Sequence, residues 1–161
     1  DLTVCLLNRP RHLEIIETLD KFKINKKLIS DGDVSGALLV SDNKYSVDMF
    51  IGIGGGPEGV IAASALDAFG CFFQGRFLFK KDNDIKRARL MGINDLNKKY
   101  EINEIVSGDS IFIATGITDG DLVKGIKVKG NKFISETLVT HKNSNTKEIR
   151  LKENSIFWFI I

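Results

Sequence analysis

Two short loops carry side chains whose chemistry suits a phosphorylated ligand. Arg9 and Arg11 follow an apolar run, and their guanidinium groups are planar, permanently charged donors that match phosphate oxygens. Asp31 and Asp33 flank Gly32 in the second loop, where their carboxylates can accept hydrogen bonds from hydroxyl groups. Two guanidinium groups together with two carboxylates predict a site for a phosphorylated polyol.

A third loop is rich in glycine. The glycines at positions 52, 54, 55 and 56 let the backbone approach a ligand, so we expect exposed N–H groups around Gly55 to contact it. Pro57 suits the first turn of a helix, and the N-terminus of a helix can bind phosphate. Glu58 is expected at the rim of this turn, where its carboxylate is a hard oxygen ligand for a divalent cation.

Each loop also has a purely structural explanation. The arginines could be a solvated pair at a helix entry, and the aspartates could cap the next helix. A carboxylate such as Glu58 is favourable in the first turn of a helix without a metal, and the glycine turn could have no ligand. Two motifs do not fit: the dinucleotide pattern G-x-G-x-x-G, counted from Gly52, meets Pro57 at its last glycine, and the Gly-Lys-Ser/Thr ending of the P-loop is absent.

Three other polar features have weaker functional interpretations. His12 is expected to form a hydrogen bond at a helix start, because no second histidine or cysteine lies within metal-ligand spacing. The loop 116–121 could bind an ion, although an Asp-Gly turn explains it equally well. The basic residues of the segment 86–89 are most simply the solvated face of a helix.

The pattern of apolar residues predicts the elements that hold the three loops. The run 2–7 is typical of a strand buried on both faces of a parallel sheet. We expect further strands over 27–29 and 47–53, and helices over 12–22, 34–40 and 60–69, the last ending at Gly70. Because ligands of open α/β sheets bind outside the carboxyl ends of the strands, the three loops should converge.

In the second half of the chain the apolar residues follow a different spacing. We expect a strand pair or bulged strand over 71–79, an amphipathic helix over 84–91 and a helix or loop over 93–106. A strand over 110–115 precedes alternating segments at 126–129, 132–140 and 148–151, which indicate antiparallel hairpins. The prediction is a single α/β domain over residues 1–161, with a mixed sheet and flanking helices.

Composition narrows the class of protein. The 161 residues suffice for one buried core, and a net charge of +2 gives no indication of nucleic-acid binding. No apolar run reaches the roughly 18 residues of a membrane span, and we expect no membrane association. Cys5 and Cys71 lack a C-x-x-C spacing and are expected to be buried thiols in the reducing cytoplasm. Since Asp1 leads directly into a buried strand, we expect a fragment of a longer protein.

Six segments, in order along nearly the whole chain, together resemble one known family. They are Arg9–His12, Leu28–Val34, Gly52–Val60, Gln74–Arg76, Ala88–Ile93 and Ala114–Leu122. On these segments the chain is similar to the C-terminal half of class II fructose-1,6-bisphosphatases, whose bacterial members can also hydrolyse sedoheptulose 1,7-bisphosphate. Two positions depart from the family pattern: Asn8 stands in place of an expected aspartate, and Gly56 in place of a small non-glycine residue.

The resemblance implies a layered α/β sugar-phosphatase fold and a role in gluconeogenesis. It implies Mn²⁺- or Mg²⁺-dependent hydrolysis of the 1-phosphate of fructose 1,6-bisphosphate, with metal ions activating a water for in-line attack. The implied roles are phosphate binding by Arg9, Pro10 and Arg11, sugar binding by Asp31, Gly32 and Asp33, backbone contact at Gly55, and metal coordination by Glu58.

Most metal-binding carboxylates of the family belong to an N-terminal half, so no catalytic residue is expected in this chain, and the fragment alone should be inactive. The expected partners are the sugar bisphosphate, that N-terminal half and further copies in a homo-oligomer. An alternative function is a non-catalytic module that binds or senses a phosphosugar. A nucleotide-binding oxidoreductase domain is a remote alternative, given the glycine spacing counted from Gly52.

Overall fold

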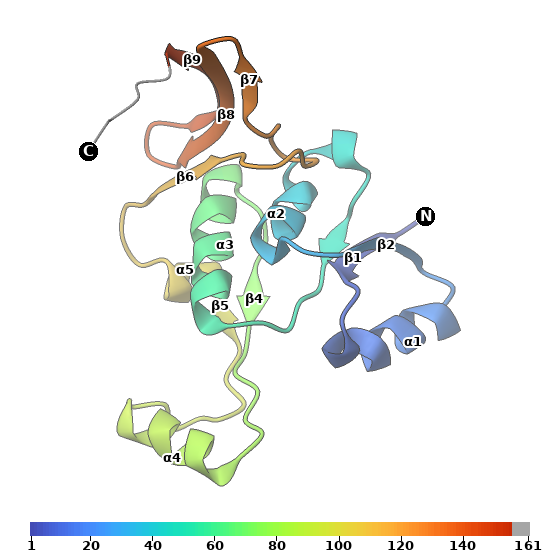
Figure 1. Cartoon of the computed structure of the whole chain (residues 1–161). Helices are drawn as coiled ribbons and strands as arrows, with labels where there is room; N and C mark the ends of the chain where they lie inside the picture. Colours follow the sequence, from blue (N-terminus) through green and yellow to red (C-terminus); the bar gives the residue numbers. More distant parts are fainter. Residues whose placement is uncertain (156–161) are drawn as a thin grey trace, which may run out of the picture.

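The computed structural model describes residues 1–155, and it has the predicted α/β class, with sheets and flanking helices (Figure 1). The elements of the first half are β1 (Thr3–Leu7), the 3₁₀ helix η1 (Pro10–His12), α1 (Leu13–Lys21), β2 (Asn25–Ile29), α2 (Asp33–Leu38), the 3₁₀ helices η2 (Leu39–Ser41) and η3 (Asn43–Tyr45), β3 (Met49–Phe50) and α3 (Gly56–Phe69). Those of the second half are β4 (Gln74–Gly75), α4 (Asp82–Leu90), β5 (Tyr100–Glu101), α5 (Ile102–Ile105), β6 (Ile111–Thr115), β7 (Lys127–Lys129), β8 (Lys132–His141) and β9 (Thr146–Ser155).

The first sheet is parallel, with strand order β2-β1-β3. Its central strand β1 is buried from Val4 to Leu7, as its continuous apolar run predicts. Leu19 of α1 packs on one side of this strand, against Val4 and Leu6. Leu39 and Val47 pack with Cys5 in a separate cluster. The strand predicted over 2–7 and the helix predicted over 12–22 are thereby confirmed.

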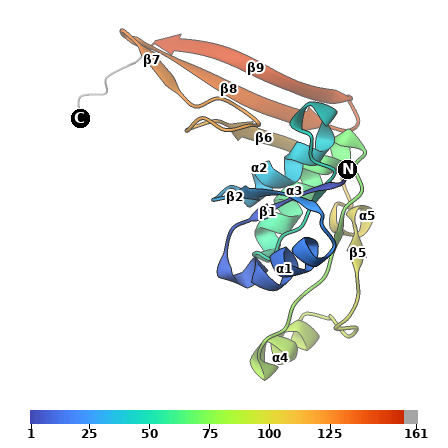
Figure 2. The same cartoon turned by 90° about the vertical axis from the view of Figure 1, so that its right-hand side faces the viewer.

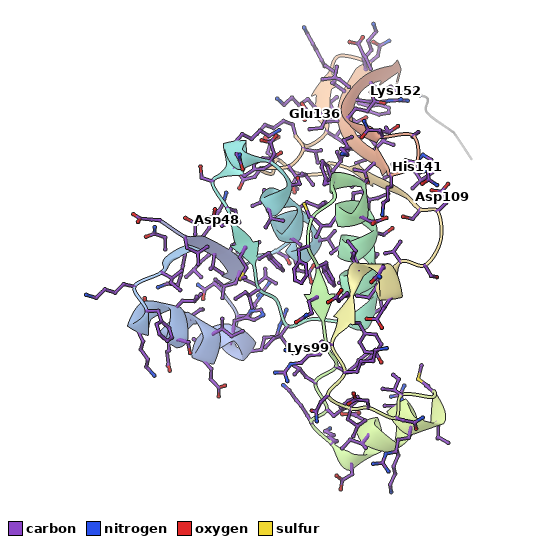
Figure 3. All side chains as sticks on the ribbon, turned by 180° about the vertical axis from the view of Figure 1, so that it is seen from behind. Asp48, Lys99, Asp109, Glu136, His141 and Lys152 are labelled. Carbon is purple, nitrogen blue, oxygen red and sulfur yellow. The ribbon has the colours of Figure 1, made fainter. Side chains whose placement is uncertain are left out.

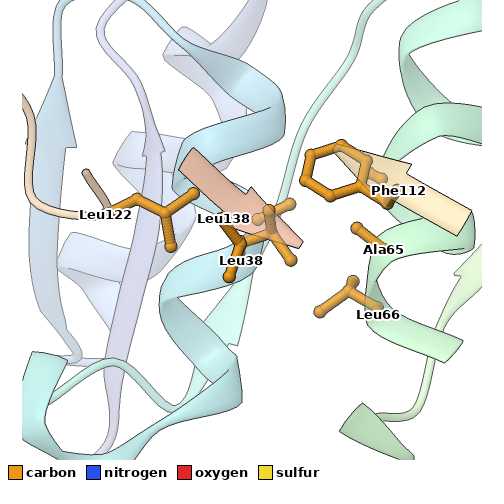
Figure 4. Close-up of a cluster of buried hydrophobic side chains, with 8 residues drawn as sticks. Leu38, Ala65, Leu66, Phe112, Leu122 and Leu138 are labelled. Atoms are coloured by element: carbon orange, nitrogen blue, oxygen red, sulfur yellow. The ribbon is translucent and has the colours of Figure 1, made fainter. Parts of the chain in front are cut away.

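The second large sheet is antiparallel, and it pairs β8 with β6, β7 and β9. Helices α2 and α3 lie between this sheet and the parallel one (Figures 1 and 2). The main core fills this layer, where Leu38 and Leu66 of the two helices meet Phe112 and Leu138 of the sheet (Figure 4). The hairpins predicted in the second half are confirmed, and β9 extends well beyond the predicted 148–151.

Helix α3 owes its central position to small residues. Ala62, Ala63 and Ala65 are buried, so that the helix axis can approach both of its neighbours closely. The helix ends at Gly70, which has φ +66° and ψ 24°, the left-handed conformation in which glycine has no Cβ penalty. Its start at Gly56, with Pro57 in the first turn, agrees with the predicted N-terminus.

The outer corner of the antiparallel sheet is closed by a histidine. His141, the last residue of β8, has its Nε2 atom 2.8 Å from Oδ1 of Asp109, which precedes β6 (Figure 3). Its Nδ1 atom lies 2.7 Å from Oγ of Ser144 in the turn between β8 and β9. The side chain therefore links two connections that are distant in sequence.

Some predicted strands differ from the observed ones. The parallel and antiparallel strands lie in three separate sheets and not in one mixed sheet, because α2 and α3 separate them. The strand predicted over 47–53 is only Met49–Phe50, since the chain turns into the glycine loop after Ile51. Within 71–79, only Gln74–Gly75 is a strand, and its partner is the distant β5.

The segment 93–106, for which a helix or loop was expected, contains β5 and the short helix α5. Glu101 and Glu104 form a capping box at the start of α5. The apolar sequence of residues 156–161 predicts a short strand-like or buried tail, and these residues lie outside the part of the chain that the structure describes. Within residues 1–155, no helix has the length and apolar character needed to cross a membrane.

Candidate functional site

Three predicted site residues contact three successive residues of the glycine loop. Nε of Arg11 donates a hydrogen bond to the carbonyl oxygen of Ile53. The carboxylate of Asp33 lies beside Gly54, where a Cβ atom would be 3.3 Å from Oδ2. The carboxylate of Glu58 folds back over Gly55 so closely that a Cβ atom there would overlap it. The prediction that the three loops converge is therefore confirmed as a matter of geometry.

His12 fixes the first loop to the third. Its fully buried imidazole donates from Nδ1 to the carbonyl oxygen of Leu7 at 2.9 Å, and Nε2 accepts from the N–H of Ile53 at 2.8 Å. A ring that donates at one nitrogen and accepts at the other is a neutral imidazole with its proton on Nδ1. Both nitrogens are occupied, so His12 is a hydrogen-bonding residue, as expected, and not a metal ligand.

The first and second loops also meet directly. Nη2 of Arg9 lies 3.8 Å from Oδ1 of Asp31, and both side chains are exposed. An exposed ion pair of this length adds little stability, because water screens it. Arg9 and Asp31 therefore stay accessible to a ligand at the same edge of the parallel sheet as Arg11 and Asp33.

The two aspartates organise the start of α2. Oδ1 of Asp31 accepts from the N–H of Gly32 at 2.9 Å, and Oδ1 of Asp33 accepts from the N–H of Val34 at 2.9 Å. Gly32 has φ +82°, and the hydroxyl of Ser35 donates to its carbonyl oxygen at 2.9 Å. Neither aspartate caps α2 with its side chain, because the N-cap residue is Gly32, so the capping explanation is wrong, although one oxygen of each aspartate binds the N–H of the following residue. The second oxygen of Asp33 faces Gly54 and the converging loops.

The start of α3 presents free backbone donors. Gly55 is the N-cap residue, with φ −72° and ψ 150°, and makes no side-chain cap. The first N–H groups of a helix have no partner within it, and residues 54–58 are exposed. A Cβ atom at position 55 would overlap the end of the Glu58 side chain, which would have to move aside, and the φ there is ordinary, whereas a Cβ atom at Gly56 would have no neighbour within 4 Å.

Glu58 is the residue of this site that suits a divalent cation. Its carboxylate is exposed at the rim of the loop and offers the oxygen ligand that Mg²⁺ and Mn²⁺ prefer. Among residues 1–155, no three His, Cys, Asp or Glu side chains are grouped so that they could hold a metal ion. Glu58 could supply one position of a coordination sphere, and these residues do not provide a complete set of ligands.

The acidic loop 116–121, which follows β6, is held in place by hydrogen bonds and an ion pair. Oδ1 of Asp119 accepts from the N–H of Gly125 at 2.9 Å, and Asp121 pairs with Lys27 of β2 at 2.5 Å. Oε2 of Glu136 accepts from the N–H of Lys124 at 2.8 Å. The turn explanation of 116–121 is favoured, because its two carboxylates already have partners. Nothing in the sequence pattern singled out Lys27, which lies on a predicted strand 94 positions from Asp121.

Comparison with known proteins identifies the family. The family model described as bacterial fructose-1,6-bisphosphatase, glpX-encoded, matches residues 1–154. The chain belongs to this family. The resemblance to class II fructose-1,6-bisphosphatases is thereby confirmed, and the converging loops fall within the matched residues.

Curated relatives of the family have the same name. The chain is 39% identical over 161 residues to a D-fructose 1,6-bisphosphatase class 2/sedoheptulose 1,7-bisphosphatase of Synechococcus sp. (strain JA-2-3B'a(2-13)), covering 91% of this chain and 46% of the relative. It is 35% identical over 159 residues, with the same shares covered, to the protein of that name from Trichodesmium erythraeum (strain IMS101). The chain spans about half the length of the curated relatives it matches.

Proposed function

We propose that this chain is the substrate-binding part of a metal-dependent sugar bisphosphatase that hydrolyses the 1-phosphate of fructose 1,6-bisphosphate. The observation that carries the proposal is the contact of Arg11, Asp33 and Glu58 with residues 53–55. The guanidinium group of Arg11 can bind phosphate, the carboxylate of Asp33 can accept hydrogen bonds from hydroxyl groups, and the carboxylate of Glu58 can bind a metal ion. All three then lie around one exposed loop. The family and the names of the curated relatives support the same activity, which would serve gluconeogenesis in the cytoplasm.

Arg9, Pro10 and Arg11 form the phosphate-binding part of the proposed site. The hydrogen bond from Nε of Arg11 to Ile53 holds the guanidinium in place, and its terminal nitrogens make no hydrogen bond within the described residues. A donor fork that is already oriented loses less conformational freedom when it binds phosphate. Pro10 begins η1 between the two arginines and limits the freedom of the loop.

Asp31, Gly32 and Asp33 form the sugar-binding part. Their carboxylates can accept hydrogen bonds from sugar hydroxyls through the oxygens that do not bind the start of α2. Gly32 holds the left-handed turn that places both aspartates on the loop. Gly55 would contact the substrate through its backbone, in the exposed turn that Asp33 and Glu58 flank.

Glu58 would supply one oxygen ligand to Mn²⁺ or Mg²⁺. When bound, such ions neutralise phosphate charge and activate water for attack on phosphorus. The remaining ligands would come from the N-terminal half of a longer enzyme, so this chain alone binds substrate without turning it over. Its own contribution is the orientation of the phosphosugar by the two arginines and the two aspartates.

The test is phosphate release by the intact protein in the presence of Mn²⁺. Fructose 1,6-bisphosphate should yield one equivalent of phosphate and fructose 6-phosphate, and EDTA should stop the reaction. Sedoheptulose 1,7-bisphosphate, offered separately, measures the preference for chain length. Calorimetric binding without any phosphate release would instead support the phosphosugar-sensing module, and the absence of both would refute a phosphosugar site.

A further inference from the structure

The acidic loop is the first part of a longer loop, 116–126, whose backbone is closed on itself. The carbonyl oxygen of Ile117 accepts from the N–H of Ile126 at 3.2 Å, and the side chain of Asp119 binds the N–H of Gly125. A Cβ atom at Gly125 would lie only 2.8 Å from the backbone N of Asp119 and from the carbonyl oxygen of Ile117. Two stretches of backbone in such close contact leave the loop little freedom to change shape.

Strand β8 holds this loop in a fixed place. The N–H of Gly116 donates to the carbonyl oxygen of Glu136 at 3.0 Å, and the N–H of Lys124 donates to its carboxylate at 2.8 Å. Glu136 lies in β8 (Figure 3). The loop is therefore a rigid extension of the antiparallel sheet.

Two adjacent residues of the loop reach the two elements that carry the proposed sugar-binding residues. Asp121 pairs with Lys27 of β2 at 2.5 Å. Leu122 is buried in the same apolar cluster as Leu38 of α2 (Figure 4). The segment 30–33 joins β2 to α2. Neighbouring side chains of one rigid loop therefore hold the elements on both sides of this segment.

The ion pair lies on the face of the parallel sheet that is directed toward the helical layer. Lys27 is paired in register with Cys5 of β1, so the two side chains lie on the same face. On this face Leu39 and Val47 pack with Cys5. The side chains of Lys27 and Asp121 are 34% and 55% exposed, and an ion pair of this kind adds little to the stability of the whole fold. Its effect should therefore be local.

We propose that Asp121 is a positioning residue of the phosphosugar site. Through Lys27 it fixes β2, while the adjacent Leu122 fixes α2, and together they set the separation of the carboxylates of Asp31 and Asp33. The inference rests on the proposed function, in which these two aspartates bind the sugar. Asp121 itself does not touch the substrate. Sugar hydroxyls need both acceptors at the right distance, and a displacement well below the length of a bond lowers the affinity.

The test is a double-mutant cycle on the intact protein, with the affinity for fructose 1,6-bisphosphate measured by calorimetry in EDTA. Asp121→Ala and Lys27→Ala should each raise the dissociation constant about fivefold. The double variant should be no weaker than either single variant, because the second change removes a partner that is already lost. The control Lys142→Ala breaks an ion pair with Asp67 of α3, which does not flank the segment 30–33, and should stay within about twofold of the wild type.

Amide hydrogen exchange of the ligand-free protein gives a second measurement. Asp121→Ala should speed exchange in peptides that cover 30–36 by about threefold or more and leave α1 unchanged, which separates a local effect from general destabilisation. Additive losses in the cycle, unchanged exchange in 30–36, or an unaltered affinity of Asp121→Ala beside a wild type that binds would refute the positioning role alone. A wild type that binds no sugar bisphosphate would refute the proposed function and this role together.

Discussion

Ile53 donates its backbone N–H to Nε2 of His12 at 2.8 Å, and this bond joins the glycine loop to the loop that carries Arg9 and Arg11. The carbonyl oxygen of the same residue accepts from Nε of Arg11. Both polar backbone groups of Ile53 are therefore bound by two adjacent side chains of the first loop. One residue of the glycine loop thus sets the distance between the proposed phosphate-binding and metal-binding groups.

Replacing His12 by alanine should separate these loops. The change leaves the N–H of Ile53 without its partner and removes a fully buried side chain, so we expect a loss of about 3 kcal/mol in the free energy of unfolding. Urea unfolding of the intact protein measures this loss. The control Asn8→Ala, an exposed change in the same loop, should stay within about 0.5 kcal/mol of the wild type. Equal stability of the two variants would contradict the role given to His12.

Two neighbouring glycines provide a matched pair for the metal site. In Gly55→Ala the new methyl group displaces the carboxylate of Glu58, while the ordinary φ of −72° tolerates alanine. We expect the Mn²⁺ concentration for half-maximal activity to rise about tenfold or more, because metal affinity depends on ligand orientation. Stability should change by less than about 1 kcal/mol.

The companion change, Gly56→Ala, meets no atom within 4 Å at the start of α3. It should leave the Mn²⁺ dependence unaltered and stabilise the helix by up to about 1 kcal/mol. Titration of phosphate release with Mn²⁺, together with thermal unfolding of both variants, separates the two effects. If both alanines shift the Mn²⁺ dependence equally, the position of Glu58 over Gly55 has no functional meaning.

The two cysteines should differ in reactivity. Burial raises the pKa of the Cys5 thiol above its usual 9.0 and also raises the pKa of Cys71, which is only partly buried. At about pH 8, iodoacetamide should label Cys71 slowly and Cys5 only after unfolding in urea, as peptide mapping would show. Rapid labelling of Cys5 in the folded protein would contradict its place in the core.

The same shift gives a pH dependence of stability. The folded protein keeps the Cys5 thiol protonated, so the stabilising contribution is complete below the unfolded thiol pKa and is lost as pH rises above about 9. Wild type should therefore lose more stability than Cys5→Ala on going to alkaline pH. Urea midpoints measured on both proteins across this range provide the check.

Much of the first half of this chain could be predicted from its sequence, because the patterns that indicate its helices and strands are local. The apolar run of β1, the spacing of apolar residues in α1 and the left-handed glycine after α3 each lie within one element. The convergence of the three loops follows from a general property of parallel sheets. These features need no knowledge of which distant residues meet.

The features that were missed depend on long-range partners. The bond between His12 and Ile53 spans 41 positions, and the pair of Lys27 and Asp121 spans 94. The short strands β4 and β5 are separated by residues 76–99 and have no pattern of their own. The division into separate sheets depends on where α2 and α3 lie, which periodicity does not fix.

The argument from glycine spacing against a dinucleotide-binding site was too strong. Counted from Gly54, the dinucleotide spacing is met at Gly54, Gly56 and Gly59, so glycine spacing alone does not exclude a dinucleotide site. The family match supplies the distinction instead, together with the side chains that surround the loop. A glycine pattern indicates a close backbone approach, and the neighbouring charged residues decide which ligand it suits.

The most direct test of the central claim is the affinity of the intact protein for fructose 1,6-bisphosphate, measured by calorimetry in EDTA, where the metal-dependent reaction is stopped. Arg11→Lys keeps the positive charge but loses the planar fork and the bond to Ile53, so the dissociation constant should rise about tenfold or more. Lys152→Ala, on β9, should leave it unchanged. An unaltered affinity of Arg11→Lys would contradict a phosphosugar site built on these three loops.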